Sequence, residues 1–552
     1  MATDTSQPTP GQTPIQELPP GLVNEFVIGV SERTRHEFIQ THISYLLMTV
    51  DRVYKIRKAV RFPFLSFATR AERNQDCLRE VQLNRRLAPD VYLGVAPLLQ
   101  DDGQWTLGEI GEELWPAGGH TAAPEHCVVM KRLRSGADAQ SLLEKGELTG
   151  EHIDAIADRI AEFHQANRLS RPAPYSAEAW LSRTASPVID TLDLIVRNAP
   201  EEALVRLASQ LIPRCKDWID QRRETLEQRR LDGRAVDGHG DLQLAHVWFD
   251  GPTLEPSIID CTEFNEDFRR IDAASEVAFL AMDLTYRGHG ELAERFLARY
   301  AGQSDDFGLY ALVDYYAFYR AAVRAKVAVL AALETEISAP QREGAIGSAH
   351  AHLRLAERFI ETHSEASITI TCGSVGCGKS TVAREFAEAL PAVVISSDRT
   401  RKRLAGLRDV DRSAAAGEPE SGLYSSARTE EVYLAMLERA GPIVDSGRNV
   451  ILDASFSRKS QRDAVRRWAT ARGIGAQLLE VRCSKDLAME RLAKRERSGH
   501  DPSDAGPSLY RWSVENFQPP TEWPRENVIE IVTDDSEWRD RLAGLQNSRP
   551  TP

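Results

Sequence analysis

The stretch ITITCGSVGCGKSTVARE at residues 368–385 carries the clearest structural pattern in the sequence. An apolar run leads into a glycine-rich segment, and a segment with helical spacing follows. It matches G-x-x-x-x-G-K-[ST] in the strand–loop–helix context that a phosphate-binding loop requires. Glycines let backbone N–H groups converge on phosphate oxygens, and a helix N-terminus adds positive potential. We therefore expect ATP to contact Gly373, Ser374, Val375, Gly376, Cys377, Gly378, Lys379, Ser380 and Thr381.

Within this loop two side chains have expected roles in catalysis. Lys379 is expected to reach the β- and γ-phosphates, and the Ser380 hydroxyl to ligate Mg²⁺. From residue 367 to 545 the order is strand, loop, helix, strand, helix, strand, helix, strand. That alternation predicts an α/β domain with a parallel sheet and helices on both faces.

Polar residues follow the next two predicted strands. Asp398 follows AVVIS (392–396) and is a candidate base for an attacking hydroxyl, while Arg401 is a candidate clamp for the acceptor. Asp453 ends NVILD (449–453) and could order the acceptor or the water shell of magnesium. Arg491 and Arg495 are four residues apart on a predicted helix, so they share a face and could cover the nucleotide. Taken singly, these residues equally suit helix caps or surface charges.

Together, GSVGCGKS, ISSDRTRKRLAG, VILDASFSRKSQR and the paired arginines resemble the P-loop kinases of the polynucleotide 5′-kinase and zeta-toxin type. The resemblance covers about residues 367–545. It implies Asp398 as general base, Arg401 as an acceptor-binding residue, and Arg491 and Arg495 as lid arginines. It identifies phosphoryl transfer to a hydroxyl, and leaves open whether the hydroxyl belongs to a nucleic acid or to a small metabolite.

A second set of residues lies in the N-terminal part of the chain. DGHGDLQLAHVWF (237–249) and PSIIDCTEF (256–264) supply two carboxylates, Asp241 and Asp260. One can deprotonate an acceptor hydroxyl while the other holds Mg²⁺ on a nucleotide. Upstream, Lys55 lies on a predicted strand and Glu80 on the following helix, an order typical of a Lys–Glu pair that positions phosphates.

This part, about residues 25–360, resembles the aminoglycoside phosphotransferase branch of the protein-kinase-like fold. The resemblance implies Asp241 as catalytic base, Asp260 as a Mg²⁺ ligand, residues 276–278 as a brace for the catalytic loop and residues 128–130 as the hinge beside adenine. The family pattern has Asn where this chain has His246, and no glycine-rich loop precedes Val53. Because Mg²⁺ prefers oxygen ligands, His246 in the second metal position favours slow turnover, Mn²⁺, or nucleotide binding alone.

Length and composition set the wider frame. The chain has 552 residues, 42% of them hydrophobic, which is enough for several packed domains. We expect a flexible tail at 1–20, an α+β protein-kinase-like domain at 21–363 and an α/β P-loop domain at 364–552. Seven scattered cysteines, no apolar run of membrane-spanning length and no signal-like N-terminus favour a cytoplasmic protein without a membrane partner.

The sequence thus predicts an ATP-dependent phosphotransferase with an alcohol acceptor, and three interpretations stay open. The first, a polynucleotide 5′-hydroxyl kinase, is favoured by basic clusters at 458–467 and 482–497, although the formal net charge of -14 opposes it. The second is a small-metabolite kinase. In the third, the N-terminal domain senses a ligand and gates a P-loop NTPase or toxin-like switch.

Overall fold

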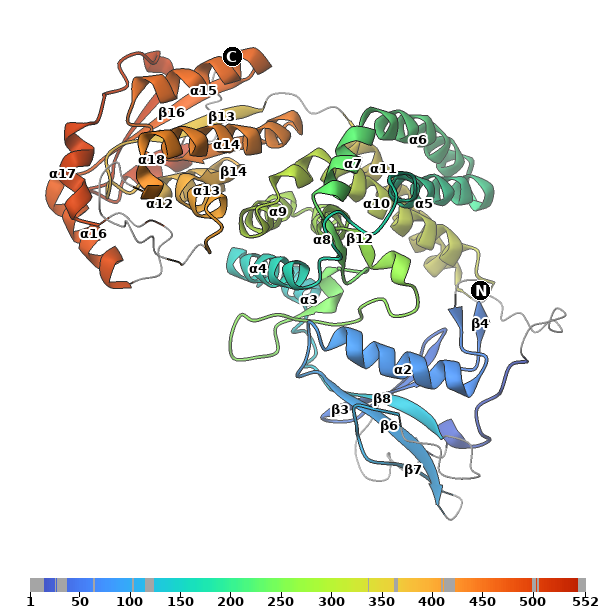
Figure 1. Cartoon of the computed structure of the whole chain (residues 1–552). Coiled ribbons are helices and arrows are strands. Elements are labelled where there is room, and N and C mark those ends of the chain that lie inside the picture. The colour runs from blue at the N-terminus through green and yellow to red at the C-terminus, as the bar shows by residue number, and fades with distance from the viewer. Residues whose placement is uncertain are drawn as a thin grey trace. The chain divides into compact units, whose positions relative to one another are not determined.

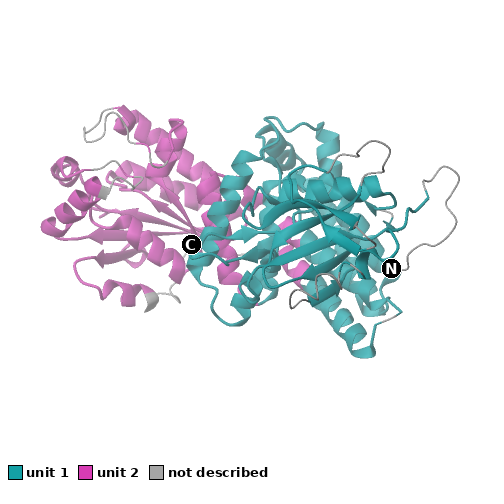
Figure 2. Cartoon of the chain, turned by 90° about the horizontal axis from the view of Figure 1, so that it is seen from below, with its two compact units in different colours: residues 1–287, 319–354 teal, residues 288–318, 355–552 magenta. Residues whose placement is uncertain are grey.

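A computed structural model describes the chain over residues 14–24, 26, 37–62, 65–101, 104–114, 124–335, 337–361, 366–408, 411, 422–498, 503 and 506–544. The chain divides into two compact units, coloured in Figure 2. The first contains residues 1–287 and 319–354, and the second contains residues 288–318 and 355–552. Residues 288–318 therefore belong to the same unit as the phosphate loop, although they lie far from that loop in the sequence.

The first unit begins with a six-stranded antiparallel sheet in the order β1-β2-β3-β8-β6-β7. Its strands are β1 (Glu37–Gln40), β2 (Ser44–Met48), β3 (Arg52–Arg57), β6 (Tyr92–Asp101), β7 (Gln104–Leu107) and β8 (Glu125–Lys131). Helix α2 (Arg70–Asn84) packs against β6 and β8 (Figure 1). Thr69 and Glu72 form a capping box, which fixes where α2 begins.

Among the described residues, helices and three short strand pairs form most of the rest of the first unit. The helices are α3 (Ala139–Glu144), α4 (Gly150–Ala166), α5 (Ala177–Asn198), α6 (Glu202–Gln221), α7 (Arg223–Leu231), α8 (Ala273–Tyr286) and parts of α10 (Val313–Ala332) and α11 (Ala339–Phe359). Short strand pairs lie between them: β4 (Arg61–Phe62) with β5 (Leu65–Ser66), β9 (Ala235–Asp237) with β12 (Arg270–Asp272), and β10 (Val247–Trp248) with β11 (Ser257–Ile258). The predicted carboxylate Asp241 lies between β9 and β10, and Asp260 lies just after β11.

The second unit is built on a five-stranded sheet in the order β14-β15-β13-β16-β17. All four pairings are parallel, between β13 (Ser367–Cys372), β14 (Ala392–Ser396), β15 (Asn449–Asp453), β16 (Gly475–Arg482) and β17 (Val528–Val532). Parallel strands buried on both faces read as near-continuous apolar runs, as the burial of β13 illustrates. The carboxyl ends of β13, β14 and β15 meet at one edge, where the phosphate loop lies.

Eight helices of the described residues in the second unit surround this sheet. They are α9 (Gly290–Ser304), α12 (Lys379–Ala389), α13 (Ser397–Leu404), α14 (Ser426–Asp445), α15 (Lys459–Arg472), α16 (Lys485–Ser498), α17 (Ser508–Glu515) and α18 (Trp538–Gly544). One core cluster joins Phe386 of α12, Leu479 of β16, Ile531 of β17 and Trp538 of α18. This packing holds the phosphate-loop helix against the sheet.

The two fold classes predicted from the sequence are confirmed. The N-terminal part combines an antiparallel sheet with helices, and the C-terminal part is a parallel α/β fold with one more strand, β17, than the pattern indicated. The boundary proposed near residue 363 and most of the tail proposed at 1–20 lie outside the described residues. None of the described helices combines the length and apolar character that crossing a bilayer requires.

Candidate active site

The phosphate loop connects β13 to α12 as the motif requires. Gly373 and Gly378 have positive φ values of 155° and 95°, a backbone region that L side chains rarely adopt. The Lys379 ammonium donates to the Ser374 carbonyl oxygen at 2.7 Å, so it lies folded over its own loop. The backbone N–H of Val375 donates to Ser513 Oγ at 2.9 Å, which ties the loop to α17.

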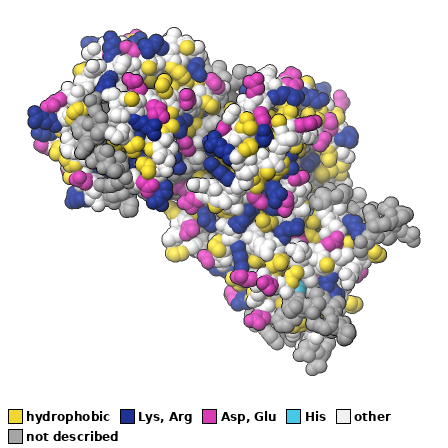
Figure 3. All heavy atoms as spheres, viewed as in Figure 1, with side chains coloured by type: hydrophobic (Ala, Val, Ile, Leu, Met, Phe, Trp, Pro, Cys, Tyr) yellow, Lys and Arg dark blue, Asp and Glu magenta, His cyan; other side chains and the backbone are white. Residues whose placement is uncertain are grey.

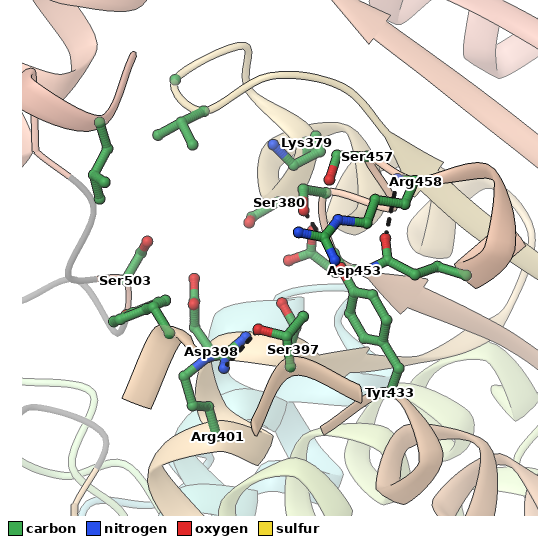
Figure 4. A pocket seen from close by; sticks show the side chains of 18 of the residues that line it. Lys379, Ser380, Ser397, Asp398, Arg401, Tyr433, Asp453, Ser457, Arg458 and Ser503 are labelled. Atoms are coloured by element: carbon green, nitrogen blue, oxygen red, sulfur yellow. Dashed lines mark hydrogen bonds between the residues drawn. The ribbon is translucent and has the colours of Figure 1, made fainter. Parts of the chain in front are cut away.

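Asp453 lies at the end of β15 beside the loop. The Ser380 hydroxyl hydrogen-bonds to its carboxylate (Figure 4), and Thr371 Oγ1 lies 3.5 Å from its Oδ1. Burial raises the pKa of Asp453, while Ser380 and the nearby Lys379 lower it. Of the two roles open from sequence, this geometry suits magnesium better than the acceptor.

The donor set here fits a Mg²⁺ ion. A serine hydroxyl and a carboxylate supply the oxygen ligands that Mg²⁺ prefers, and both lie next to the phosphate loop. Ser380 and Asp453 would hold the ion, directly or through its waters. When bound, Mg²⁺ neutralises charge on the phosphate oxygens.

Asp398 lies in the first turn of α13, and its strand β14 ends two residues earlier, at Ser396. Ser396 caps the helix by accepting the Arg399 N–H. Asp398 and Arg401 are three residues apart on α13, so they share a face. Both line the cavity that also contains Lys379. The sequence expectation that these two residues act together therefore has a physical basis.

Arg401 is buried and held in a fixed position. Its Nη1 donates to the Leu423 carbonyl oxygen at 2.6 Å and lies 3.4 Å from Thr429 Oγ1. Its guanidinium carbon lies 4.7 Å from the centre of the Tyr424 ring, a cation–π contact. Within the described residues its buried Nε has no hydrogen-bond partner. Arg401 also lines the same cavity as Lys379, where a guanidinium is suited to an anionic group of a ligand.

These residues enclose a cavity of about 210 Å³ (Figure 4). The phosphate loop and Asp453 line one part, and α13, α14 and the start of α15 line another. The sequence analysis did not single out several of its lining residues: Ser397, Tyr424, Ser426, Thr429, Tyr433, Ala454, Ser455, Ser457, Arg458, Gln461, Ser503, Leu509 and Trp512. Of these residues, Arg458 was marked only as part of the basic cluster at 458–467. The hydroxyl residues Ser426, Thr429 and Tyr433 of α14 belong to no sequence motif.

The paired lid arginines have different surroundings. Arg495 lines the cavity. Arg491 instead donates to the Cys377 carbonyl oxygen at 3.2 Å and to Thr533 Oγ1 at 2.8 Å. A Cβ on Gly378 would lie 3.0 Å from Arg491 Nη1, so this guanidinium lies against the loop backbone. The structure thus brings Arg495 to the cavity and Arg491 to the loop.

In the first unit Lys55 and Glu80 meet as the sequence predicts. Lys55 Nζ lies 2.8 Å from Glu80 Oε1, on β3 and α2 respectively. Burial lowers and Glu80 raises the pKa of Lys55, and the net direction is upward. The sequence analysis missed Arg57, whose Nη2 lies 2.6–2.7 Å from carboxylates of Asp76, Glu80 and Glu263.

Asp241 is held by its own loop. Gln243 Nε2 donates to Asp241 Oδ1 at 2.6 Å, and burial raises the pKa of Asp241. Glu276 of α8 accepts the Gly240 N–H on both oxygens, at 3.1 and 3.2 Å. Burial raises the pKa of Glu276 to about 7. Glu276 therefore contacts the backbone next to Asp241, where the resemblance implies a brace.

Asp260 and His246 form the second half of this site. Asp260 has a φ of 64°, unusual for a residue other than glycine, and its Oδ1 lies 4.0 Å from Lys55 Nζ. His246 Nε2 lies 3.5 Å from Asp260 Oδ2, and its Nδ1 lies 2.8 Å from the Asp241 carbonyl oxygen. Burial raises the pKa of Asp260, but Lys55 and His246 outweigh it and the pKa is lowered.

The donor set of Asp260 and His246 fits Mg²⁺ only in part, since one ligand is an imidazole. Over the described residues no group of three or more His, Cys, Asp or Glu side chains is arranged to hold a metal ion. Residues 128–130, expected as the hinge, lie in β8, where Val128 and Val129 are buried. Their hinge role stays a prediction.

Comparison with known proteins adds three findings. The family model AAA_33, described as an AAA domain, matches residues 368–520, so the C-terminal region carries a P-loop kinase-family domain. Two solved structures are similar to parts of the chain. One is an aminoglycoside phosphotransferase from Alicyclobacillus acidocaldarius, with 14% identity, 64% of this chain and 96% of that chain covered, and a TM-score of 0.33. The other is Chaetomium thermophilum Kti12 in complex with ADP-AlF3, with 19% identity, 34% and 100% covered, and a TM-score of 0.26.

The third finding concerns a relative over most of the chain. The uncharacterized protein Rv2004c of Mycobacterium tuberculosis (strain ATCC 25618 / H37Rv) is 34% identical over 472 residues, 84% of this chain and 86% of that protein. The aligned length exceeds either unit, so the relationship extends across both. This chain belongs to the same protein family as Rv2004c.

Proposed function

We propose that the second unit transfers the γ-phosphoryl group of ATP to a hydroxyl of a small anionic acceptor. One observation carries the proposal: Asp398 and Arg401 line the same cavity as Lys379, Ser380 and Asp453. A phosphate loop alone would suffice for ATP hydrolysis. A carboxylate and a buried arginine on a separate helix add what an acceptor needs, a base and an anion clamp.

In this proposal Asp398 accepts the proton of the acceptor hydroxyl. A bond forms between the acceptor oxygen and the γ-phosphorus, the bond from that phosphorus to the β–γ bridging oxygen breaks, and ADP leaves. Lys379 and Arg495 hold the phosphate oxygens as charge shifts between them. Arg401 orients the acceptor through its anionic group. Ser380 and Asp453 hold the Mg²⁺ that accompanies the nucleotide.

The lining of the cavity supports a small acceptor. Hydroxyl groups of Ser426, Thr429, Ser455 and Tyr433 line it, and they can bind the other polar groups of a polyhydroxylated molecule. Arg401 and Arg458 favour a carboxylate or phosphate on that molecule.

The polynucleotide acceptor favoured by the sequence is the second candidate, because Arg458 and Arg495 line the cavity. Arginines of the basic clusters at 458–467 and 482–497 already form ion pairs within the protein. Arg462 is buried and bonded to Glu522, and Arg482 is bonded to Glu480. On the face seen in Figure 3, basic and acidic side chains are interspersed. An extended phosphate backbone favours a single-sign groove, so these contacts weaken this candidate.

Transfer of labelled γ-phosphate from ATP tests the proposal on the full-length protein. Pools of hydroxy acids, sugar phosphates and nucleosides are compared with a 5′-hydroxyl oligonucleotide, using the wild type, Asp398→Asn and Asp241→Asn. Asp445→Asn is a matched control, because Asp445 is an exposed carboxylate of the same unit. We expect a labelled small product that is lost in Asp398→Asn alone. Labelling of the oligonucleotide and of no small molecule would reject the small acceptor.

For the first unit we propose nucleotide binding with slow or no phosphoryl transfer. The Lys55–Glu80 pair supports nucleotide binding. The Gln243 amide on Asp241 and the imidazole of His246 oppose fast turnover, because the amide occupies a carboxylate oxygen that a substrate hydroxyl needs and imidazole is a poor Mg²⁺ ligand. Product formation that survives Asp398→Asn and stops in Asp241→Asn would instead assign transfer to this unit.

A further inference from the structure

We propose that residues 288–318 are a positioning element of the phosphotransfer site in the second unit. This inference rests on the proposed function of that unit. The segment precedes the phosphate loop by more than fifty residues in sequence, yet it belongs to the same compact unit. It comprises helix α9 and the 3₁₀-helix η3 (Phe307–Ala311), and it ends in the first turns of α10.

The segment contacts several of the elements that carry or lead into residues of the site. Helix α9 packs against β14, which leads into α13, and η3 packs against α14. Arg403 of α13 donates to the Gln303 carbonyl oxygen at 3.0 Å. Arg439 of α14 forms two hydrogen bonds with Asp305, at 3.0 and 2.9 Å. The helices that supply Asp398, Arg401 and the hydroxyl groups are therefore bonded to residues 303–305.

Two faces of α13 contact different parts of the second unit. Asp398 and Arg401 lie on one face and line the cavity. Arg399 and Arg403 are four residues apart and lie on another face. A Cβ on Gly302 would lie 3.6 Å from Arg399 Nη1, so this second face is directed at the end of α9. Contacts on this face fix the rotation of α13, and its rotation sets where Asp398 and Arg401 point.

A partly buried ion network anchors the segment to the sheet. Arg448 directly precedes β15, the strand that ends in Asp453. Its guanidinium binds Glu294 at 2.7 and 2.9 Å and both oxygens of Asp314 at 2.8 Å. It also lies 5.3 Å from the centre of the Tyr310 ring. Two bidentate contacts and a ring leave a guanidinium little freedom, so α9 and the start of α10 are fixed to β15.

Asp305 ends α9 in the left-handed region, with a φ of 52°. This conformation is costly for most residues, although Asp and Asn tolerate it. Its carboxylate is then directed to Arg439. Asn at this position keeps the backbone and removes the charge, so Asp305→Asn tests the ion pair without disturbing the turn.

The experiment uses the full-length protein and two readouts. The variants are Asp305→Asn and Arg403→Gln. Arg295→Gln is the matched control, because Arg295 lies on the same segment and its partner Glu388 is at the far end of α12 from the phosphate loop. Amide hydrogen exchange is followed in peptides from α12, α13 and α14. Steady-state kinetics give kcat for phosphoryl transfer and KM for ATP.

We expect both variants to exchange faster in α13 and α14 while α12 is unchanged. We also expect kcat to fall about 10-fold or more with KM for ATP unchanged, because a misplacement of about 1 Å at a reacting group can cost about 100-fold. Arg403→Lys keeps a donor and should restore part of kcat. The control should match the wild type in both readouts.

Three results would overturn the inference: unchanged exchange in α13, equal acceleration in all three helices, or faster exchange in α13 with unchanged kcat. The proposed function fails separately. If the wild type transfers phosphate to no acceptor, exchange in α13 still reports whether residues 288–318 hold that helix. If transfer occurs and exchange in α13 does not change, the positioning role fails and the proposed function stands.

Discussion

Replacing Glu276 by Gln should change how the stability of the first unit depends on pH. Glu276 is only 1% exposed and accepts the Gly240 N–H beside the catalytic Asp241 candidate. Burial raises its pKa to about 7 from a usual value of 4.5, against the lowering effects of Arg320 and the backbone N–H groups. The folded protein therefore binds this proton more tightly than the unfolded chain does.

The direction and the size of the effect follow from that difference. Below about pH 4.5 the carboxyl is protonated in both states and the raised pKa costs nothing. As the pH rises from about 4.5 to about 7, the unfolded chain has lost this proton while the folded protein still holds it, so the free energy of unfolding falls over this interval. A pKa change from 4.5 to about 7 corresponds to about 3 kcal/mol. Glu276→Gln is neutral at every pH and lacks this loss, while its amide oxygen can still accept from Gly240.

Calorimetric unfolding of the wild type and the variant, from about pH 5 to about pH 8.5, measures the effect. The variant should gain about 3 kcal/mol relative to the wild type over this range, in the transition of the first unit only. The difference between the two proteins matters, because other buried carboxyls such as Glu263 titrate in both. Glu178→Gln, an exposed site on α5, should show no pH-dependent difference. A difference for Glu276→Gln that stays constant with pH would refute the reasoning.

Three further changes have expected outcomes. Gly373→Ala should abolish ATP binding by the second unit, measured by calorimetric titration, because its Cβ would lie 2.3 Å from the Val481 carbonyl oxygen at a φ of 155°; normal affinity would contradict this. Asp453→Asn should raise the Mg²⁺ concentration needed for turnover. Because burial raises the pKa of Asp453 in the metal-free site, protons compete with Mg²⁺ there, and the wild type should need more Mg²⁺ as the pH is lowered. An unchanged Mg²⁺ titration in the variant would exclude the metal role. Lys55→Met should remove nucleotide binding by the first unit and destabilise it by roughly 1–3 kcal/mol, since Glu80 is nearly inaccessible; unfolding and binding titrations that match the wild type would argue against both roles.

The phosphate loop could be predicted because its chemistry lies on consecutive residues. Strand, glycines, Lys379 and Ser380 follow one another, so local spacing alone specifies their geometry. The Lys55–Glu80 pair could also be predicted, from the order of a strand and the helix that follows it, and the two side chains meet at 2.8 Å. In both cases the sequence supplied the residues and short-range structure supplied their arrangement.

Contacts between residues far apart in the sequence could not be predicted from local sequence patterns. Arg448 and Glu294 are 154 residues apart, and each reads as an ordinary surface charge. Arg57 forms ion pairs with three carboxylates, two on α2 and one in the segment after β11. No local sequence pattern predicts these ion pairs. The helical spacing of Arg491 and Arg495 predicted a shared role, but Thr533 binds one of them and leaves the other at the cavity.

The surroundings of the two candidate bases explain why we assign transfer to the second unit. Asp241 and Asp398 both follow a short strand, and both are candidate bases from the sequence. The Gln243 amide occupies one oxygen of Asp241, and a substrate hydroxyl must compete with it. Asp398 lines a cavity that also contains the phosphate-loop lysine and Arg401. A base needs a position where its proton donor can sit within reach, and the described residues provide that position beside Asp398.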